Sequence, residues 1–247
     1  MRLPGGAAVE IARDLHLIPG TSTANACLYV GQTCVLFDTG LPGDGPRVLE
    51  YLERLGRRPQ DLSVIALTHA DPGHCGAAAW LRRNSAARVF ASPDAAVLAS
   101  HPNPPGLLRW AWRSALQLMR RPVEPFAVDG LLGEQDTLEG FRVVDTPGHS
   151  PGHICFFRPE DGVLIAGDAV RVSGRDLLSP PFWDSESEWN ARLSVAKLAD
   201  LPIHLLIPGH GPPFREPAEQ LRRVGGPPGF LEARLRRSGE LAKRRRP

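Results

Sequence analysis

Short runs of apolar residues, separated by Gly, Pro and polar positions, recur along most of the chain. Runs of roughly four to eight apolar residues between turn residues are typical of strands that are buried in a sheet. The strands predicted in this way lie at 9–18, 26–30, 33–37, 63–67, 88–91, 141–145, 153–157, 163–166 and 204–207. The Gly31-Gln32 pair would join the second and third of them as a β-hairpin.

Helical spacing occurs in the segments between these strands. Val48, Leu49, Leu52 and Leu55 recur at helical intervals, and Gly56 ends the pattern. Further helices are expected at about 76–84, within 100–126 and at 187–201. The helix within 100–126 would either pack on the core or form a wall or lid over a site. Strands with intervening helices predict a layered α/β or α+β fold.

Length and charge set the domain organisation. A chain of 247 residues with 42% hydrophobic residues is long enough for one large domain, and a net charge of +2 favours no class of partner. We expect this domain at 1–218, with a helical insertion at about 100–126, followed by a basic C-terminal helix or tail at 219–247. The tail carries nine Arg or Lys and three Glu. Since no aromatic interleaving or known binding module accompanies this charge, nucleic acid is an unlikely partner.

The four cysteines, at 27, 34, 75 and 155, form no CxxC pair and have irregular spacing. They therefore predict buried free thiols in a reducing compartment and not a disulfide scaffold. The N-terminal residues lack an apolar signal segment, and no run of 18 apolar residues exists. These features predict a cytoplasmic protein with no membrane span.

Four short segments rich in His, Asp and Gly each follow a predicted strand. They are THADPGH at 68–74, TPGH at 146–149, GD at 167–168 and PGHG at 208–211. Imidazole nitrogens and carboxylate oxygens are suitable ligands for zinc, iron or manganese. Loops at strand ends can direct such side chains into one cleft, where Gly and Pro allow sharp turns. The four segments therefore predict one shared metal site.

In this order the segments resemble the metallo-β-lactamase superfamily, which has a THxHxDH loop followed by separate His, Asp and His elements. The resemblance covers about residues 9–215, and Asn25 and Asp38-Thr39-Gly40 also fit the family pattern. It implies a four-layer αββα sandwich with metals at one edge, and metal-dependent hydrolysis of an ester-type bond. Residues 146–157 are most similar to the glyoxalase II branch, which favours a thioester over a lactone or a phosphoester.

The resemblance also implies a set of ligands, carried over position by position. The first metal would be held by His69, Asp71, His149 and Asp168, and the second by His74, His210 and the bridging Asp168. Zinc, as one or two ions, is the expected cofactor, with iron or manganese as alternatives. Asp71 or Asp168 would take the catalytic role of orienting the attacking water.

Two positions depart from the family pattern. Asp71 stands where the family usually has its second His, and Gly73 stands where it has the loop Asp. A carboxylate at Asp71 makes the first site harder and more anionic, which favours iron or manganese over zinc. Because Gly73 offers no ligand, the second metal would bind weakly or only with substrate. An iron-dependent redox enzyme of the same fold, of the sulfur dioxygenase or diiron type, and a non-catalytic metal-binding relative are therefore the alternatives.

Several further residues have expected or open roles. A small-molecule substrate is the expected partner, and a homo-oligomer is left open. Asp38 is expected to orient the ligand loop by hydrogen bonds. His153 would either contact the ligands or the substrate, or serve only in packing. The loop 171–183 would either line the cleft or pack on the surface. Glyoxalase II has a helical C-terminal domain that binds glutathione; only about 30 residues follow Phe214, so we expect that domain to be missing. Structural roles are expected for His16, His101 and His204.

Overall fold

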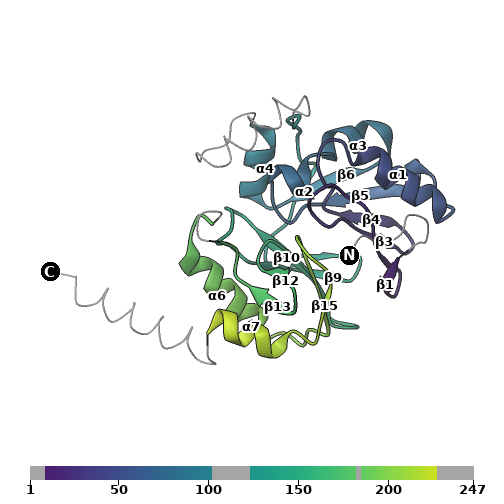
Figure 1. Cartoon of the computed structure of the whole chain (residues 1–247). Helices are drawn as coiled ribbons and strands as arrows, with labels where there is room; N and C mark the ends of the chain where they lie inside the picture. Colours follow the sequence, from purple (N-terminus) through teal and green to yellow (C-terminus); the bar gives the residue numbers. More distant parts are fainter. Residues whose placement is uncertain (1–8, 102–122, 182–184, 227–247) are drawn as a thin grey trace.

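Two β-sheets, each covered by helices on its outer face, form the fold in a computed structural model that describes residues 9–101, 123–181 and 185–226 (Figure 1). Among these residues one sheet has the strand order β1-β2-β3-β4-β5-β6-β7, and the other has the order β15-β14-β11-β10-β9-β8. The predicted αββα sandwich is confirmed.

The first sheet contains strands from residues 10–131. Its strands are β1 (Glu10–Ala12), β2 (Leu15–Leu17), β3 (Cys27–Val30), β4 (Cys34–Phe37), β5 (Leu62–Ala66), β6 (Arg88–Ala91) and β7 (Gly130–Leu131). Strands β1 to β4 pair antiparallel, whereas β4 to β7 pair in parallel. The accompanying helices are α1 (Gly45–Arg54), the 3-10 turn Pro59–Asp61, α2 (Pro72–Cys75), α3 (Ala78–Asn84) and α4 (Pro93–Ser100).

The second sheet contains residues from the C-terminal half. Its strands are β8 (Thr137–Leu138), β9 (Phe141–Asp145), β10 (Ile154–Arg158), β11 (Val163–Gly167), β14 (Leu205–Pro208) and β15 (Phe214–Arg215). Helices α6 (Glu188–Leu198) and α7 (Ala218–Gly225) lie on its outer face. A separate hairpin of β12 (Arg171–Ser173) and β13 (Asp176–Leu178) follows β11.

The apolar strands are buried on both faces, which explains why they read as continuous runs. In β4, Cys34 and Leu36 pack towards the helices, whereas Val35 and Phe37 pack between the sheets. The ring of Phe37 lies 4.7 Å from that of Phe141 and 4.9 Å from that of Phe156, measured between centroids. Burying such a side chain contributes roughly 1.5–3 kcal/mol. This aromatic contact therefore holds the two sheets face to face.

The N-terminal elements differ from the sequence prediction. The segment 9–18 is a hairpin of two strands, because Asp14 takes a left-handed conformation with φ 56° and reverses the chain. The helix expected at 76–84 corresponds to α3, and the short helix α2 that precedes it was not predicted. Helix α4 was not predicted, although its start has a recognisable cap: the Ser92 hydroxyl accepts a hydrogen bond from the backbone N–H of Ala95, and Pro93 follows.

Other expectations concern the insertion, the tail and the thiols. Most of the helix expected within 100–126 lies outside the described residues, although Phe126 packs on the core. Helix α7 begins at Ala218 and crosses the predicted boundary between 218 and 219, and its Leu221 is fully buried. All four cysteines are buried and free, as predicted. Over the described ranges, no helix is both long and apolar enough to cross a membrane.

Candidate metal centre

The four His, Asp and Gly segments meet at one edge of the sandwich. The segment 68–74 follows β5 in the first sheet, and the other three follow β9, β11 and β14 in the second sheet. Strands β9, β11 and β14 all run in the same direction, so their carboxyl ends lie at the same edge. All six predicted ligands are thereby brought together: His69, Asp71, His74, His149, Asp168 and His210.

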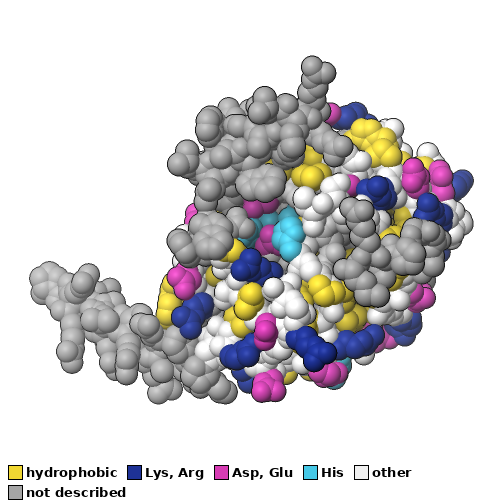
Figure 2. Space-filling model, viewed as in Figure 1, with side chains coloured by type: hydrophobic (Ala, Val, Ile, Leu, Met, Phe, Trp, Pro, Cys, Tyr) yellow, Lys and Arg dark blue, Asp and Glu magenta, His cyan; other side chains and the backbone are white. Residues whose placement is uncertain are grey.

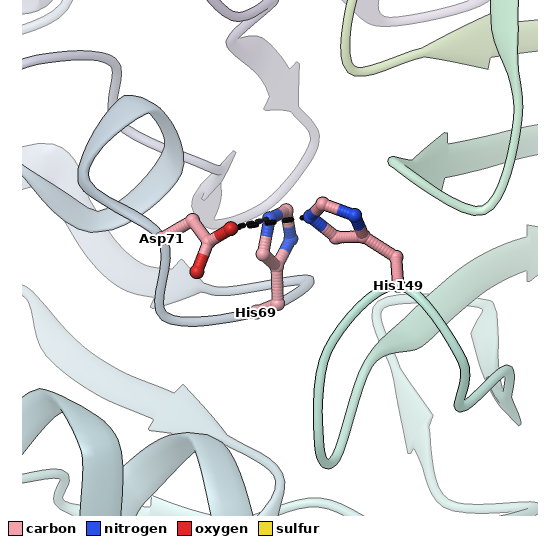
Figure 3. Close-up of side chains that lie close together, drawn as sticks. All are labelled: His69, Asp71 and His149. Atoms are coloured by element: carbon pink, nitrogen blue, oxygen red, sulfur yellow. Dashed lines mark hydrogen bonds and ion pairs between the residues drawn. The ribbon is translucent and has the colours of Figure 1, made fainter. Parts of the chain in front are cut away.

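One cluster joins the two sheets through His69, Asp71 and His149 (Figure 3). The Oδ2 atom of Asp71 lies 3.1 Å from Nε2 of His149 and 3.7 Å from Nε2 of His69. One nitrogen or oxygen of each residue lies within 4.8 Å of the others. These three side chains therefore present one oxygen and two nitrogens to a common point.

Asp168 lies between this cluster and the remaining histidines. Its Oδ1 atom is 3.3 Å from Nε2 of His74. Its Oδ2 atom is 3.3 Å from Nε2 of His210 and 3.5 Å from Nε2 of His149. A carboxylate with nitrogens on both of its oxygens has the geometry to bridge two ions.

The ligand loop is held by Asp38, as expected. The Thr68 hydroxyl donates to Asp38 Oδ2 at 2.8 Å and therefore accepts the Nδ1–H of His69 at 2.9 Å. The Nδ1–H of His74 donates to the same Asp38 oxygen at 2.7 Å. These contacts leave the Nε2 lone pairs of His69 and His74 available in the cluster. Sequence reasoning assigned no role to Thr68, since only the fold shows which groups its hydroxyl reaches.

The buried polar atoms of the cluster fit a divalent cation. Nε2 of His69, Nε2 of His74 and Oδ1 of Asp168 are buried and form no hydrogen bond with any residue of the described ranges. Buried polar atoms are normally paired, and a metal would satisfy all three. The donor set of imidazole and carboxylate also matches the preferences of zinc, iron and manganese.

The pKa values of these groups show how the charges are coupled. Burial holds the pKa of His69 well below its usual range. Burial also opposes protonation of His74, but the carboxylates of Asp168 and Asp38 outweigh it and raise the His74 pKa well above normal. Burial raises the pKa of Asp168, but the surrounding histidines have the larger effect and hold this pKa well below its usual range. Without metal, the carboxylates therefore favour a proton on His74; a cation would take its place.

His153 supports Asp168 through a hydrogen bond to its backbone. Its Nε2 accepts the backbone N–H of Asp168 at 3.0 Å, and its Nδ1 is hydrogen bonded to the Thr146 hydroxyl at 2.8 Å. Burial lowers the pKa of His153 to about 3, so the ring is neutral. The residue is also only 1% exposed. His153 is therefore a positioning residue for Asp168 and does not line the cleft.

Two glycines shape the site. A Cβ on Gly209 would overlap Oδ1 of Asp168, so the chain after β14 can pass this close only as glycine. Gly73 is less confined, since a Cβ there would lie 3.0 Å from the Thr23 hydroxyl. Gly73 could therefore accommodate a side chain if the Thr23 hydroxyl moved slightly.

The outer part of the site includes His210 and an open cleft. The His210 side chain is 46% exposed, and its Nδ1 lies 3.3 Å from the Thr23 carbonyl. Asn25 donates to the carbonyls of Pro208 and Gly211, which anchors this loop. In Figure 2, His and acidic side chains lie in a hollow beside a Lys or Arg side chain. The cleft is lined by Asp168, Arg171, Pro180, Pro181 and His210.

Three residues of the segment 171–183, namely Arg171, Pro180 and Pro181, line the cleft, while Phe182 and Trp183 lie outside the described residues. The remaining histidines have partners elsewhere. They are His16 with Tyr51, His101 with the Val97 carbonyl, and His204 with Glu216.

Comparison with known proteins agrees with this geometry. The family model described as the metallo-beta-lactamase superfamily matches residues 20–210. The probable metallo-hydrolase YflN of Bacillus subtilis is 30% identical over 238 residues, covering 85% of this chain and 88% of that protein. The hydroxyacylglutathione hydrolase GloC of Haemophilus influenzae is 25% identical over 215 residues, covering 80% and 91%.

A solved structure is similar over most of the fold. A metallo-beta-lactamase family protein from Thermus thermophilus superposes with a TM-score of 0.69 at 26% identity, covering 92% of this chain and 82% of that one. Members of this superfamily generally bind divalent metals, and the described part of the chain has a matching His and Asp cluster. The chain therefore belongs to the metallo-β-lactamase superfamily.

Proposed function

We propose that this protein is a metal-dependent hydrolase that cleaves an ester-type bond in a small molecule, with a thioester as the first candidate and a lactone or phosphoester as the others. The observation that carries the proposal is the set of buried Nε2 atoms of His69 and His74 beside the carboxylate of Asp168. The similarity to hydroxyacylglutathione hydrolases supports the preference for a thioester.

The ligands we assign follow the distances in the cluster. The first ion would be held by His69, Asp71, His149 and Asp168, and the second by His74, His210 and Asp168. The first set is complete and mostly buried. The second contains the half-exposed His210 and lacks a carboxylate at Gly73. We therefore expect the first ion to bind more tightly than the second.

A bound divalent ion supplies Lewis acidity, which lowers the pKa of water and polarises a carbonyl or phosphoryl oxygen. The chain's own residues would orient the reactants. Asp71 is partly exposed and is reached by His149, so its carboxylate can accept a hydrogen bond from an attacking water. Asp168 has both oxygens directed at histidines, which suits it for holding ligands in place. We infer that Asp71 orients water and Asp168 maintains the geometry.

The proposed cofactor is zinc, with iron or manganese as alternatives. Asp71 favours a harder ion, and this observation supports an iron-dependent redox enzyme as the second candidate function. Gly73 supports a third candidate, a non-catalytic metal-binding relative, because it removes a ligand of the second ion. The buried free thiols fit a reducing compartment, so we propose a cytoplasmic location.

Elemental analysis of protein purified without added metal tests these candidates, followed by assays on thioesters, lactones and phosphodiesters. Zinc with ester cleavage supports the proposal. Iron without ester cleavage supports the redox candidate, and substoichiometric metal without any turnover supports the non-catalytic one.

Replacing Asp168 with Ala tests the central ligand. We expect Asp168→Ala to lose most of its metal, and activity to fall by about a hundredfold or more. The exposed Asp200 offers a matched control, since Asp200→Ala removes the same group from a residue that belongs neither to the cluster nor to the lining of the cleft. Full metal content and activity in Asp168→Ala would refute the assignment.

A further inference from the structure

Asp44 is a buried carboxylate in the loop between β4 and α1. It directly precedes α1, where an aspartate usually accepts a backbone N–H of the first helical turn. Here the side chain forms no such capping bond with the described residues of α1. Because it is only 1% exposed, its charge has to be satisfied by other donors of the protein.

Four donors converge on this carboxylate. The backbone N–H of Ser22 donates to Oδ2 at 3.0 Å, and the Ser22 hydroxyl donates to Oδ1 at 2.7 Å. The backbone N–H of Leu41 and the guanidinium of Arg47 donate at 2.9 Å and 3.1 Å. These donors match the roughly four lone-pair sites that a carboxylate offers. Asp44 therefore ties the loop before β3 to the loop before α1.

The segment that Asp44 holds reaches the metal cluster one residue later. The carbonyl of Thr23 lies 3.3 Å from Nδ1 of His210 and can accept its N–H. On the other side of Thr23, the backbone N–H of Asn25 donates to the Gly209 carbonyl at 2.8 Å. With the proton on Nδ1, the Nε2 lone pair of His210 faces Asp168, whose Oδ2 lies 3.3 Å away. The Thr23 carbonyl thus directs His210 towards the cluster.

The same loop supports the other histidine of the second set of ligands. Asp38 accepts the Nδ1–H of His74 at 2.7 Å, and the Thr39 hydroxyl donates to the His74 carbonyl at 2.9 Å. A group that binds the second ring nitrogen of a ligand fixes its tautomer and direction, and its loss typically costs about 10- to 100-fold in metal affinity. His74 is buried, whereas the His210 side chain is 46% exposed. Support by hydrogen bonds therefore matters more for His210.

We propose that Asp44 is a positioning residue for His210 and thereby sets the affinity of the second ion. It acts through Ser22, which fixes the Thr23 carbonyl and with it the tautomer of His210. The inference rests on the proposed function only in taking His210 as a ligand of that ion. The loop between β4 and α1 then supports both histidines of the second set.

The zinc affinities of Asp44→Asn test this role. The substitution keeps the shape of the side chain and replaces one acceptor oxygen by a donor. Zinc-loaded protein is dialysed against a series of zinc buffers, and elemental analysis gives a Kd for each ion. His210→Ala identifies the ion that depends on His210. We expect Asp44→Asn to raise the Kd of this ion about tenfold and that of the other ion by less than about twofold.

Asp129→Asn is the matched control. Asp129 also accepts a backbone N–H and an arginine, from Val89 at 2.8 Å and Arg82 at 2.6 Å, but it belongs neither to the cluster nor to the lining of the cleft. Both Kd values should stay unchanged in this variant. A merely structural role of Asp44 would raise both Kd values together or leave both unchanged, and either result would overturn the inference.

The tautomer of His210 provides a readout that needs no bound metal. After chelation, nitrogen-15 NMR of the imidazole at a pH where the ring is neutral shows which nitrogen carries the proton. We expect the Nδ1–H form to dominate in the wild-type protein and in Asp129→Asn, and both tautomers to be populated in Asp44→Asn. Identical spectra of the His210 ring in the three proteins would contradict the role of Asp44.

Ser22→Ala serves if Asp44→Asn fails to fold, as judged by circular dichroism. It removes one hydrogen bond to the carboxylate at an exposed residue. Both readouts should shift in the same direction, with the Kd of the second ion raised about threefold, and no shift in either would overturn the inference.

These outcomes are distinct from those of the proposed function. If the wild-type protein binds no second ion, the tautomer of His210 decides the question alone. Ester cleavage tests the proposed hydrolysis and enters neither readout, so its absence would refute that hydrolysis and leave the role of Asp44 to be judged by the Kd values and the spectra.

Discussion

Asp38 connects the backbone to the metal cluster at the level of single residues. It takes a left-handed conformation, with φ 56°, directly after β4, and its side chain is almost fully buried. Oδ1 accepts the backbone N–H of Thr68, and Oδ2 accepts the Nδ1–H of His74. A residue in this sparsely populated conformation is usually held by its surroundings for a purpose. Here that conformation directs the carboxylate at the ligand loop.

A substitution at Gly73 offers the simplest test of how tightly the second ion binds. We expect Gly73→Asp to raise the tightly bound metal by up to one equivalent per chain, because it adds a carboxylate beside the loop of Thr23, whose carbonyl contacts His210. Elemental analysis after dialysis measures the change. Gly73→Ala adds a Cβ without a ligand and controls for the contact with Thr23. Equal metal contents for the two variants would show that the second set does not need this carboxylate.

At the scale of elements, strand ends decide how the site is built. Each ligand loop begins where a buried strand ends, so packing of the strands fixes the origin of the loop to within a residue. Gly209 shows how little freedom remains after β14, because a Cβ at this position would overlap the carboxylate of Asp168. A rigid strand followed by a short glycine loop positions ligands more accurately than a long loop would.

A methyl group on Gly209 should therefore disturb the site. We expect Gly209→Ala to lose metal and to unfold with a free energy lowered by roughly 1–3 kcal/mol, because Asp168 must move. Urea unfolding and elemental analysis measure the two effects. Gly133→Ala is a suitable control, since its Cβ would meet nothing closer than 3.9 Å. Comparable behaviour of both variants would contradict the argument.

The contact between His16 in β2 and Tyr51 in α1 predicts how the stability of the protein depends on pH. The Tyr51 hydroxyl accepts the N–H of Val9 at 2.8 Å and can donate to Nδ1 of His16 at 3.3 Å. Burial lowers the pKa of His16 below its usual value, so the folded protein holds the neutral ring. Below the unfolded pKa of about 6.5, the unfolded chain binds the proton more readily, and stability falls as the pH falls.

Removing the imidazole tests this contribution. In His16→Leu, we expect the decline in stability below about pH 6.5 to become shallower by at most one proton, or about 1.4 kcal/mol per pH unit. Urea unfolding of both proteins at several pH values gives the two slopes. All other titrating groups remain in both proteins, so identical slopes would mean that His16 makes no contribution.

At the scale of the whole molecule, the metal centre joins two sheets that come from different halves of the chain. His69, Asp71 and His74 belong to the half of the first sheet, whereas His149, Asp168 and His210 belong to the half of the second. A bound ion would therefore crosslink the halves in addition to the apolar contacts between the sheets. Ligands that bind only the folded state stabilise it by mass action.

Removing the metal should accordingly lower the melting temperature. At a free metal concentration about a hundredfold above Kd the stabilisation is about 2.7 kcal/mol, which corresponds to roughly 5–10 °C for a chain of this size. Calorimetry before and after chelation, and after zinc is restored, measures the shift. Asp168→Ala should show little response to the chelator. An unchanged melting temperature of the wild-type protein after chelation would contradict the idea that the metal crosslinks the two halves.

The strands were predictable because both of their faces are buried, so their apolar runs stand out from the loops. The hairpin at 9–18 was not, because Asp14 reverses a chain whose apolar residues continue on both sides. Helix α4 was missed although Ser92 and Pro93 mark its start, since its own apolar pattern is weak. Local patterns thus predict an element's type better than its ends.

The amino-acid sequence alone determined which residue types stand at the ends of the strands, and hence that a metal cluster was to be expected. The αββα sandwich was expected from the resemblance of these segments to the metallo-β-lactamase superfamily. Only the tertiary structure decided which oxygen of Asp168 faces which histidine, and that Thr68 fixes the tautomer of His69. It alone also placed Arg171 beside Asp168 and His210 in the lining of the cleft. The physical reason is distance: periodicity reports local burial, whereas hydrogen bonds and coordination depend on how segments far apart in the chain approach one another to within a few tenths of an ångström.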